Sequence, residues 1–199
     1  YRCNSIGAGG RTIRGDSLFW WGGTCWNQSR SEEAAYQLHR AMDQLQAAAA
    51  GEDGPSLAEA EAELREVADR FGGTDLADAA RLQLARLALE QDRADEARDI
   101  LVRLADRRGG DALGRLATLD LIHLRIASGQ AGEVVTELEA MAVGRNTGLP
   151  RDAALYELGR LHLKEQDVAA ARRHFQKLVD DFPESPYRSE AQRRLTELG

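Results

Sequence analysis

The chain has 199 residues and a formal charge of −7, and 43% of its residues are hydrophobic while 30% are charged. This length and composition are typical of a water-facing protein with one sizeable core. Residues 1–29 carry a charge of +2, which leaves −9 for residues 30–199. Because an acidic body lacks the basic face that neutralises phosphates, we exclude nucleic acid as a partner. No apolar run reaches the roughly 18 residues of a membrane span, so we expect none in this form.

The first 29 residues differ in composition from the rest. They contain six of the 19 glycines and all three tryptophans, which are Trp20, Trp21 and Trp26. No helical period fits this stretch, so the sequence predicts a non-helical, Gly/Trp-rich N-terminal arm. Together with Phe19, the tryptophans are an apolar load that needs a covering surface. We therefore regard these four aromatic residues as candidate anchors of the arm.

A hairpin is the local structure that we predict inside this arm. Its strands would be residues 11–14 and 17–20, joined through Gly15 and Asp16, because glycine suits the first central position of a type II′ turn. Arg14, Gly15 and Asp16 also spell the integrin-binding tripeptide. Three residues are a weak signal for adhesion, and the turn explains glycine and aspartate by geometry alone.

Both cysteines, Cys3 and Cys25, fall in the arm. A pair of cysteines confined to one short segment favours a single structural disulfide in an oxidising compartment, and the alternative is two free thiols in a cytosolic protein. The first residue is tyrosine, which indicates either a mature chain after signal-peptide removal or a trimmed chain. We expect a periplasmic or extracellular location.

From residue 30 the sequence is rich in alanine, leucine, glutamate and arginine, which favour helix. Glycine and proline clusters divide it, and an all-α body follows. The predicted helices cover residues 31–50, 56–71, 75–91, 94–108, 111–128, 131–143, 150–165, 168–182 and 186–198. The last of these carries many charged residues around a narrow apolar stripe, as a solvent-facing cap should.

A repeated pattern organises these helices, and it is most complete from Leu155 to Pro183. Leucines three residues apart and a glycine mark one helix there, while Ala171, Phe175 and Leu178 mark a second helix. The second-helix positions recur every 37 residues. The earlier sets are Val134, Leu138 and Met141, then Ala97, Leu101 and Leu104, then Ala60, Leu64 and Val67. First-helix leucines obey the same step at Leu84, Leu121 and Leu158, and at Leu87, Leu124 and Leu161.

This pattern resembles the tetratricopeptide repeat, whose helix pairs stack into a solenoid. Two positions depart from its consensus: His162 stands where tyrosine is usual, and Gln166 fills a turn where glycine is common. The resemblance implies a right-handed superhelix of about four helix pairs over residues 30–199, with a C-terminal capping helix. The 183–187 junction is similar to that of bacterial cell-envelope members: the barrel-assembly lipoprotein, the division-coordinating periplasmic protein and the membrane-tethered chaperone-associated protein.

Catalytic and metal-binding motifs are not apparent. The four histidines, His39, His123, His162 and His174, lie in neither an H-E-x-x-H motif nor at metal-ligand spacing with cysteines or carboxylates. Glycines 7, 9 and 10 are not followed by the helix that a phosphate-binding loop requires. We therefore expect a protein that is not an enzyme and that has no cofactor.

The remaining candidate site is the face formed by the first helix of each pair, which the resemblance places on the concave side. Apolar side chains with a basic or histidine residue at each step indicate a groove for peptide segments. The alternative is that these leucines complete the core between helices. The predicted groove residues are Leu82, Arg86, Leu89, Leu119, His123, Ile126, Tyr156, Arg160 and Leu163.

Three functions are compatible with these features. The first is a non-catalytic interaction scaffold of the bacterial envelope or exterior that binds protein segments in its groove. The second is a structural subunit whose arm docks on a neighbouring copy, so that the chain forms a homo-oligomer or filament. The third is an engineered fusion in which residues 1–29 are a foreign peptide on a solenoid carrier.

Overall fold

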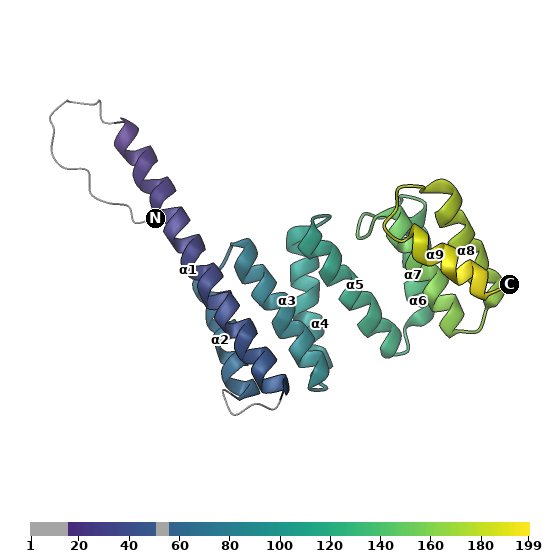
Figure 1. The fold of residues 1–199 in the computed structure, drawn as a ribbon, viewed down its shortest axis with the longest axis horizontal. Helices are drawn as coiled ribbons and strands as arrows, with labels where there is room; N and C mark the ends of the chain where they lie inside the picture. Colours follow the sequence, from purple (N-terminus) through teal and green to yellow (C-terminus); the bar gives the residue numbers. More distant parts are fainter. Residues whose placement is uncertain (1–15, 51–55) are drawn as a thin grey trace. The chain divides into compact units, whose positions relative to one another are not determined.

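The computed structural model describes residues 16–50 and 56–199, and it describes side chains from residue 30 onward. The described residues form nine helices and are all-α, as predicted (Figure 1). The helices are α1 (Asp16–Ala50), α2 (Leu57–Arg70), α3 (Asp75–Glu90), α4 (Ala94–Arg108), α5 (Ala112–Ala127), α6 (Ala131–Ala142), α7 (Arg151–Lys164), α8 (Val168–Asp181) and α9 (Arg188–Glu197).

From α2 onward, each predicted helix is confirmed to within about two residues at either end. Side-chain caps explain several of the starts, because they satisfy backbone N–H groups that the first helical turn leaves unpaired. Ser56 and Glu59 form a reciprocal capping box at α2. Asp111 accepts a hydrogen bond from the Gly114 N–H at 2.9 Å, and Asp167 accepts one from the Ala170 N–H at 2.9 Å.

The start of α1 corrects the prediction for the N-terminal arm. The helix begins at Asp16, so the second predicted strand, residues 17–20, is helical and the hairpin is wrong. A lone hairpin is marginal in water, whereas extending an existing helix adds a backbone hydrogen bond for each residue fixed. The strongly helix-forming stretch before Ala50 supplies that existing helix. Residues 1–15, with Cys3 and Arg14, lie outside the described residues, as do the side chains of Cys25 and of the four aromatic anchors.

The chain divides into two compact units, residues 1–87 and residues 88–199, with the division in the last turn of α3. In the first unit α1 packs against α2. Arg40 on α1 forms an ion pair with Glu63 on α2, with 2.6 Å between Nη2 and Oε1. In the second unit α4 packs against α5, and α6, α7, α8 and α9 pack in sequence (Figure 1). Within each unit, these packed helices are consecutive in the chain, as in a solenoid.

The 37-residue series forms the core of these packed helices. The second-helix positions are all at most 2% exposed. They are Ala60, Leu64 and Val67, then Ala97, Leu101 and Leu104, then Val134, Leu138 and Met141, then Ala171, Phe175 and Leu178. The periodicity therefore marks the residues that lose contact with water on folding, which is the main source of stability in such a protein.

Gly159 on α7 allows α8 to approach this helix closely. A Cβ atom at this position would lie 2.5 Å from Cε1 of Phe175 on α8, well inside van der Waals contact. The absence of a side chain at residue 159 is what makes room for the phenylalanine ring. This agrees with the sequence-based interpretation that Gly159 lets the second helix approach.

The turns between paired helices repeat an unusual backbone conformation at the same interval. Asp92, Gly129 and Gln166 have φ angles of 59°, 84° and 65°. This left-handed region costs a residue with a side chain roughly 1–2 kcal/mol, and glycine adopts it freely. Gln166, one of the two departures from the repeat consensus, is therefore held in a strained turn.

We expect that Gln166→Gly stabilises the second unit. The gain should be about 1 kcal/mol or less, because relief of the left-handed strain is partly offset by the greater freedom of glycine in the unfolded chain. Urea unfolding followed by circular dichroism measures this change. The converse substitution at the equivalent position, Gly129→Gln, should lower the midpoint; equal midpoints for both variants and the parent would contradict the strain argument.

Candidate functional site

The structure brings six of the nine predicted groove residues onto two helices of the second unit. Leu119, His123 and Ile126 lie on α5, and Tyr156, Arg160 and Leu163 lie on α7. We call these six residues the α5/α7 face. The apolar members and Tyr156 are half-buried and pack against the core, whereas His123 and Arg160 are exposed.

The other three predicted groove residues lie on α3. Leu82 is only 3% exposed, so it contributes to packing and offers almost no surface to a ligand. Arg86 and Leu89 are half-buried, and the division between the units separates them. The second unit therefore contains Leu89 and the six residues of the α5/α7 face, whereas Leu82 and Arg86 belong to the first unit.

Glu157 links the two helices of this face, although it is not one of the predicted groove residues. Its carboxylate is 8% exposed. Oε2 lies 3.2 Å from Nε2 of His123 on α5, and Nη1 of Arg160 donates to Oε1 and Oε2 at 3.1 and 3.2 Å. A nearly buried carboxylate needs such partners to offset lost hydration. The basic or histidine residue at each step of the predicted groove was a partial signal for Glu157, because cationic side chains on a partly buried face need an acidic partner nearby.

Tyr156 is the aromatic centre of the face. Its ring stacks on that of Tyr187 with centroids 4.9 Å apart, and it meets Phe175 at 6.0 Å. The guanidinium of Arg160 lies 5.9 Å from its centroid, within cation–π range. Burial is the main cause that raises the pKa of the Tyr156 hydroxyl, and the nearby Glu190 adds to it. The ring is therefore neutral and held on several sides.

Two cavities open beside these residues. One of about 300 Å³ is lined by His123, Ile126, Glu157, Arg160, Leu161 and Lys164. The other, of about 620 Å³, is mostly apolar and has Leu116, Leu119, Leu149, Pro150 and Tyr187 among its lining residues. Volumes of this order suit a few side chains of a bound segment. Apolar pockets beside charged hydrogen-bonding groups can recognise an extended peptide through side chains and backbone alike.

Within residues 16–50 and 56–199, no group of three or more histidine, cysteine, aspartate or glutamate side chains is placed to hold a metal ion. No helix in the same ranges combines the length and apolar character that crossing a bilayer requires.

The remaining described histidines lie outside the α5/α7 face. His39 on α1 is exposed and lies 3.4 Å from Asp43. His162 on α7 and His174 on α8 stack with ring centroids 5.3 Å apart and planes 4° from parallel. Burial is the main cause that lowers the pKa of His174, and His162 is the next. Arg173 and Lys177 lower that pKa further, while Glu139 opposes them.

We expect His174 to make the protein less stable in mild acid. A lowered pKa in the folded state means that the unfolded chain takes up the proton first as the pH falls. The stability that the neutral His174 contributes is therefore complete above the ordinary histidine pKa of about 6.5. It is lost as the pH falls from there towards the lowered pKa of the folded state. The melting temperature should therefore drop as the pH falls below about 6.5. His174→Gln should reduce that drop, while His39→Gln serves as the exposed control; identical pH profiles for His174→Gln and the parent would refute this expectation.

Comparison with protein families agrees with the helical arrangement. The profile described as a tetratricopeptide repeat-like domain matches residues 17–152, and one described as a tetratricopeptide repeat matches residues 153–185. The first match begins at residue 17, inside the predicted N-terminal arm of residues 1–29. Among curated proteins, none matches this sequence.

Several solved structures share the fold. The tetratricopeptide-like repeats of a putative kinesin light chain from Podosopora anserina have a TM-score of 0.56 at 19% identity, over 83% of this chain and 84% of that one. A tetratricopeptide repeat protein from Parabacteroides merdae has a TM-score of 0.55 at 14% identity, over 84% of this chain and 60% of that one. BtubC (BKLC) from P. vanneervenii has a TM-score of 0.54 at 14% identity, over 86% of this chain and 82% of that one. At such identities the likeness extends to the fold alone.

Proposed function

Because the chain belongs to the family of tetratricopeptide repeat-like domains, whose profile covers more than half of it, we propose that it is a non-catalytic scaffold that binds peptide segments on its α5/α7 face. Tetratricopeptide repeats generally mediate protein–protein interactions. The observation that carries the proposal is the arrangement around Glu157. A nearly buried carboxylate holds His123 and Arg160 in place between half-buried apolar side chains, so polar and apolar groups are presented together.

This arrangement favours a partner with both apolar and acidic side chains. Arg160 and Lys164 bring two positive charges to the smaller cavity, against the single carboxylate of Glu157. The half-buried Leu119, Ile126 and Leu163 provide the apolar contacts beside it. Fixed side chains lower the entropic cost of binding, because less freedom is lost when the partner arrives.

Selection from a display library of random peptides tests the proposal. Peptides selected on the parent chain should bind Leu163→Asp at least about tenfold more weakly, since a new anion would face the acidic residues of the ligand. Val102→Asp is the matched control, because Val102 is exposed on α4 of the same unit and lies outside the face. Failure to select any peptide, or equal binding by the two variants, would refute binding at this face.

We also propose that the protein works in the bacterial envelope or exterior. Two features support this location: both cysteines fall in one short segment, and the 183–187 junction is similar to that of envelope members of the family. In an oxidising compartment Cys3 and Cys25 should form a disulfide. Titration of the native protein with a thiol reagent should then find no free thiol, and two reactive thiols would contradict both the pairing and this part of the proposal.

Self-assembly is the alternative that a specific observation favours. The +2 charge of residues 1–29 complements the −9 of the remainder, and all three tryptophans lie in that stretch. The arm of one copy would dock on the next in a head-to-tail manner. The mass in solution tests this, because a monomer excludes it, and Trp20→Ala with Trp21→Ala should abolish any oligomer. The fusion hypothesis has less support, since neither α1 nor the family match has a boundary at residue 30.

A further inference from the structure

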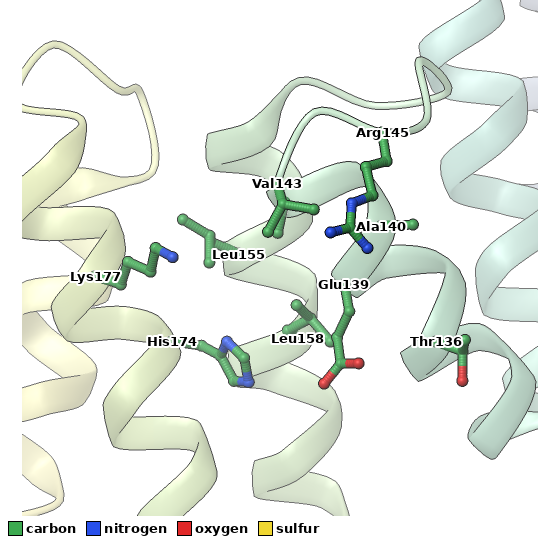
Figure 2. Close-up of a pocket in the computed structure, with 10 residues that line it drawn as sticks. Thr136, Glu139, Ala140, Val143, Arg145, Leu155, Leu158, His174 and Lys177 are labelled. Atoms are coloured by element: carbon green, nitrogen blue, oxygen red, sulfur yellow. The ribbon is translucent and has the colours of Figure 1, made fainter.

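A separate cavity opens where α6, α7 and α8 meet, and it shares no lining residue with the α5/α7 face. Its volume is about 490 Å³, within the range of about 300–1,000 Å³ that is usual for ligand pockets. We call it the α6/α8 pocket. Figure 2 shows its lining residues, which come from α6, the connection after it, α7 and α8.

The base of the α6/α8 pocket is apolar. Leu155 and Leu158 on α7 are fully buried beneath it. Val143, at the end of α6, is 52% exposed, which is high for a side chain of this kind. A ligand that covered Val143 would remove apolar surface from water and gain affinity from it, whereas Leu155 and Leu158 are already shielded from water.

The polar groups of the pocket are unevenly charged. Arg145 and Lys177 line it, and among the described residues neither has an ion-pair partner. Glu139 is the only carboxylate in the lining, so the two cations leave a net positive charge in a protein whose formal charge is −7. In Figure 2, Val143 and Leu155 lie between the two cationic side chains, while Glu139 and His174 lie near Leu158.

We propose that the α6/α8 pocket binds an apolar group that ends in a single carboxylate. The apolar part covers Val143 and the carboxylate pairs with Arg145, while Lys177 adds positive charge from the other side of Val143 and Leu155. Arginine can hold both oxygens through its planar fork, whereas lysine adds a compact charge. Glu139 disfavours a second carboxylate on the ligand, because two like charges would meet there.

Two sources can supply this chemistry: the C-terminal residue of a peptide, or a free small acid with an apolar side chain. The test titrates N-acetyl-leucine and a tetrapeptide that ends in leucine into methyl-labelled protein, each as the free acid and as the C-terminal amide. Methyl resonances of Val143, Leu155 and Leu158 should shift with the free acids. Saturation with the amides should need at least about tenfold higher concentration, since a charge-assisted hydrogen bond is lost. A tighter tetrapeptide identifies a peptide end, and equal affinities identify a small acid.

Variants separate this site from general charge effects. Arg145→Gln should bring the affinity for the free acids down to that for the amides, and Lys177→Gln should lower it by a smaller factor. Arg173→Gln is the matched control. Arg173 is an exposed cation on α8, the helix that carries Lys177, and it does not line the pocket. The proposal is overturned by any of three results: no methyl shifts, equal affinity for acid and amide, or an equal loss in the Arg173 control. Shifts confined to Leu119, Ile126 and Leu163 would also overturn it, while leaving the proposed function intact.

Discussion

Gly159→Ala is expected to destabilise the protein by about 1–3 kcal/mol, the usual cost of forcing an extra group into a well-packed core. The new Cβ atom would lie within 2.5 to 2.7 Å of three carbon atoms of the Phe175 ring. Phe175 is fully buried, so the ring has no open space in which to move away. The helices α7 and α8 would have to separate, and their shared contacts would be lost along much of their length.

A second substitution should rescue this variant. The three earlier positions of the series are leucines, at residues 64, 101 and 138, so a leucine at residue 175 has precedent within the same chain. Phe175→Leu removes the ring atoms that the alanine would strike. The double variant should therefore be more stable than the sum of the two single effects predicts, by at least about 0.5 kcal/mol of coupling. Denaturant unfolding of all four proteins measures the coupling, and strictly additive costs would show that Gly159 is needed for some other reason.

Leu138→Ala should cost still more, about 2–5 kcal/mol, because it deletes buried methyl groups and leaves a cavity. Leu138 is fully buried in the core of the second unit, at the centre of α6. The helices beside it, α5 and α7, belong to different pairs, so the pairs on both sides lose packing. A protein of this kind is held together by contacts between neighbours, and a weak middle repeat should broaden the unfolding transition.

The control for this variant is Val143→Ala, which shortens an apolar side chain on the surface near the same helix. Val143 is half exposed, so its truncation should change the free energy of unfolding by less than about 1 kcal/mol. Urea titration monitored at 222 nm compares the two directly. A smaller loss for Leu138→Ala than for Val143→Ala would mean that the repeat series does not mark the core.

The repeat made most of the fold predictable from sequence. Positions such as Leu101 and Phe175 recur at one fixed interval because every helix pair solves the same packing problem, and a single sequence displays that regularity several times over. The start of α1 could not be found in this way. Residues 16–29 lie before the first full repeat unit, and their tryptophans and glycines favour other structures locally. Helix propagation from the following stretch is a cooperative effect that a local pattern does not reveal.

The candidate site was predictable only in part. The 37-residue step placed Leu119 and Tyr156 at equivalent positions of two first helices, and the family resemblance implied that these positions share the concave face. It could not show that Glu157 would become the buried link between His123 and Arg160, since this depends on how α5 packs against α7. The prediction that Leu82 lies on the surface was wrong for the same reason. Periodicity identifies a helix face, and the neighbouring structure decides whether that face is covered.

The placement of the aromatic residues gives the two units different optical signals. All three tryptophans lie in the first unit, towards the start of α1, whereas the stacked rings of Tyr156 and Tyr187 lie in the second. Tryptophan emission therefore comes from the first unit alone. The two stacked tyrosines should give the second unit a near-ultraviolet dichroism band that disappears when their stacking is lost. One unmodified sample, heated once, can thus show which half of the solenoid melts first.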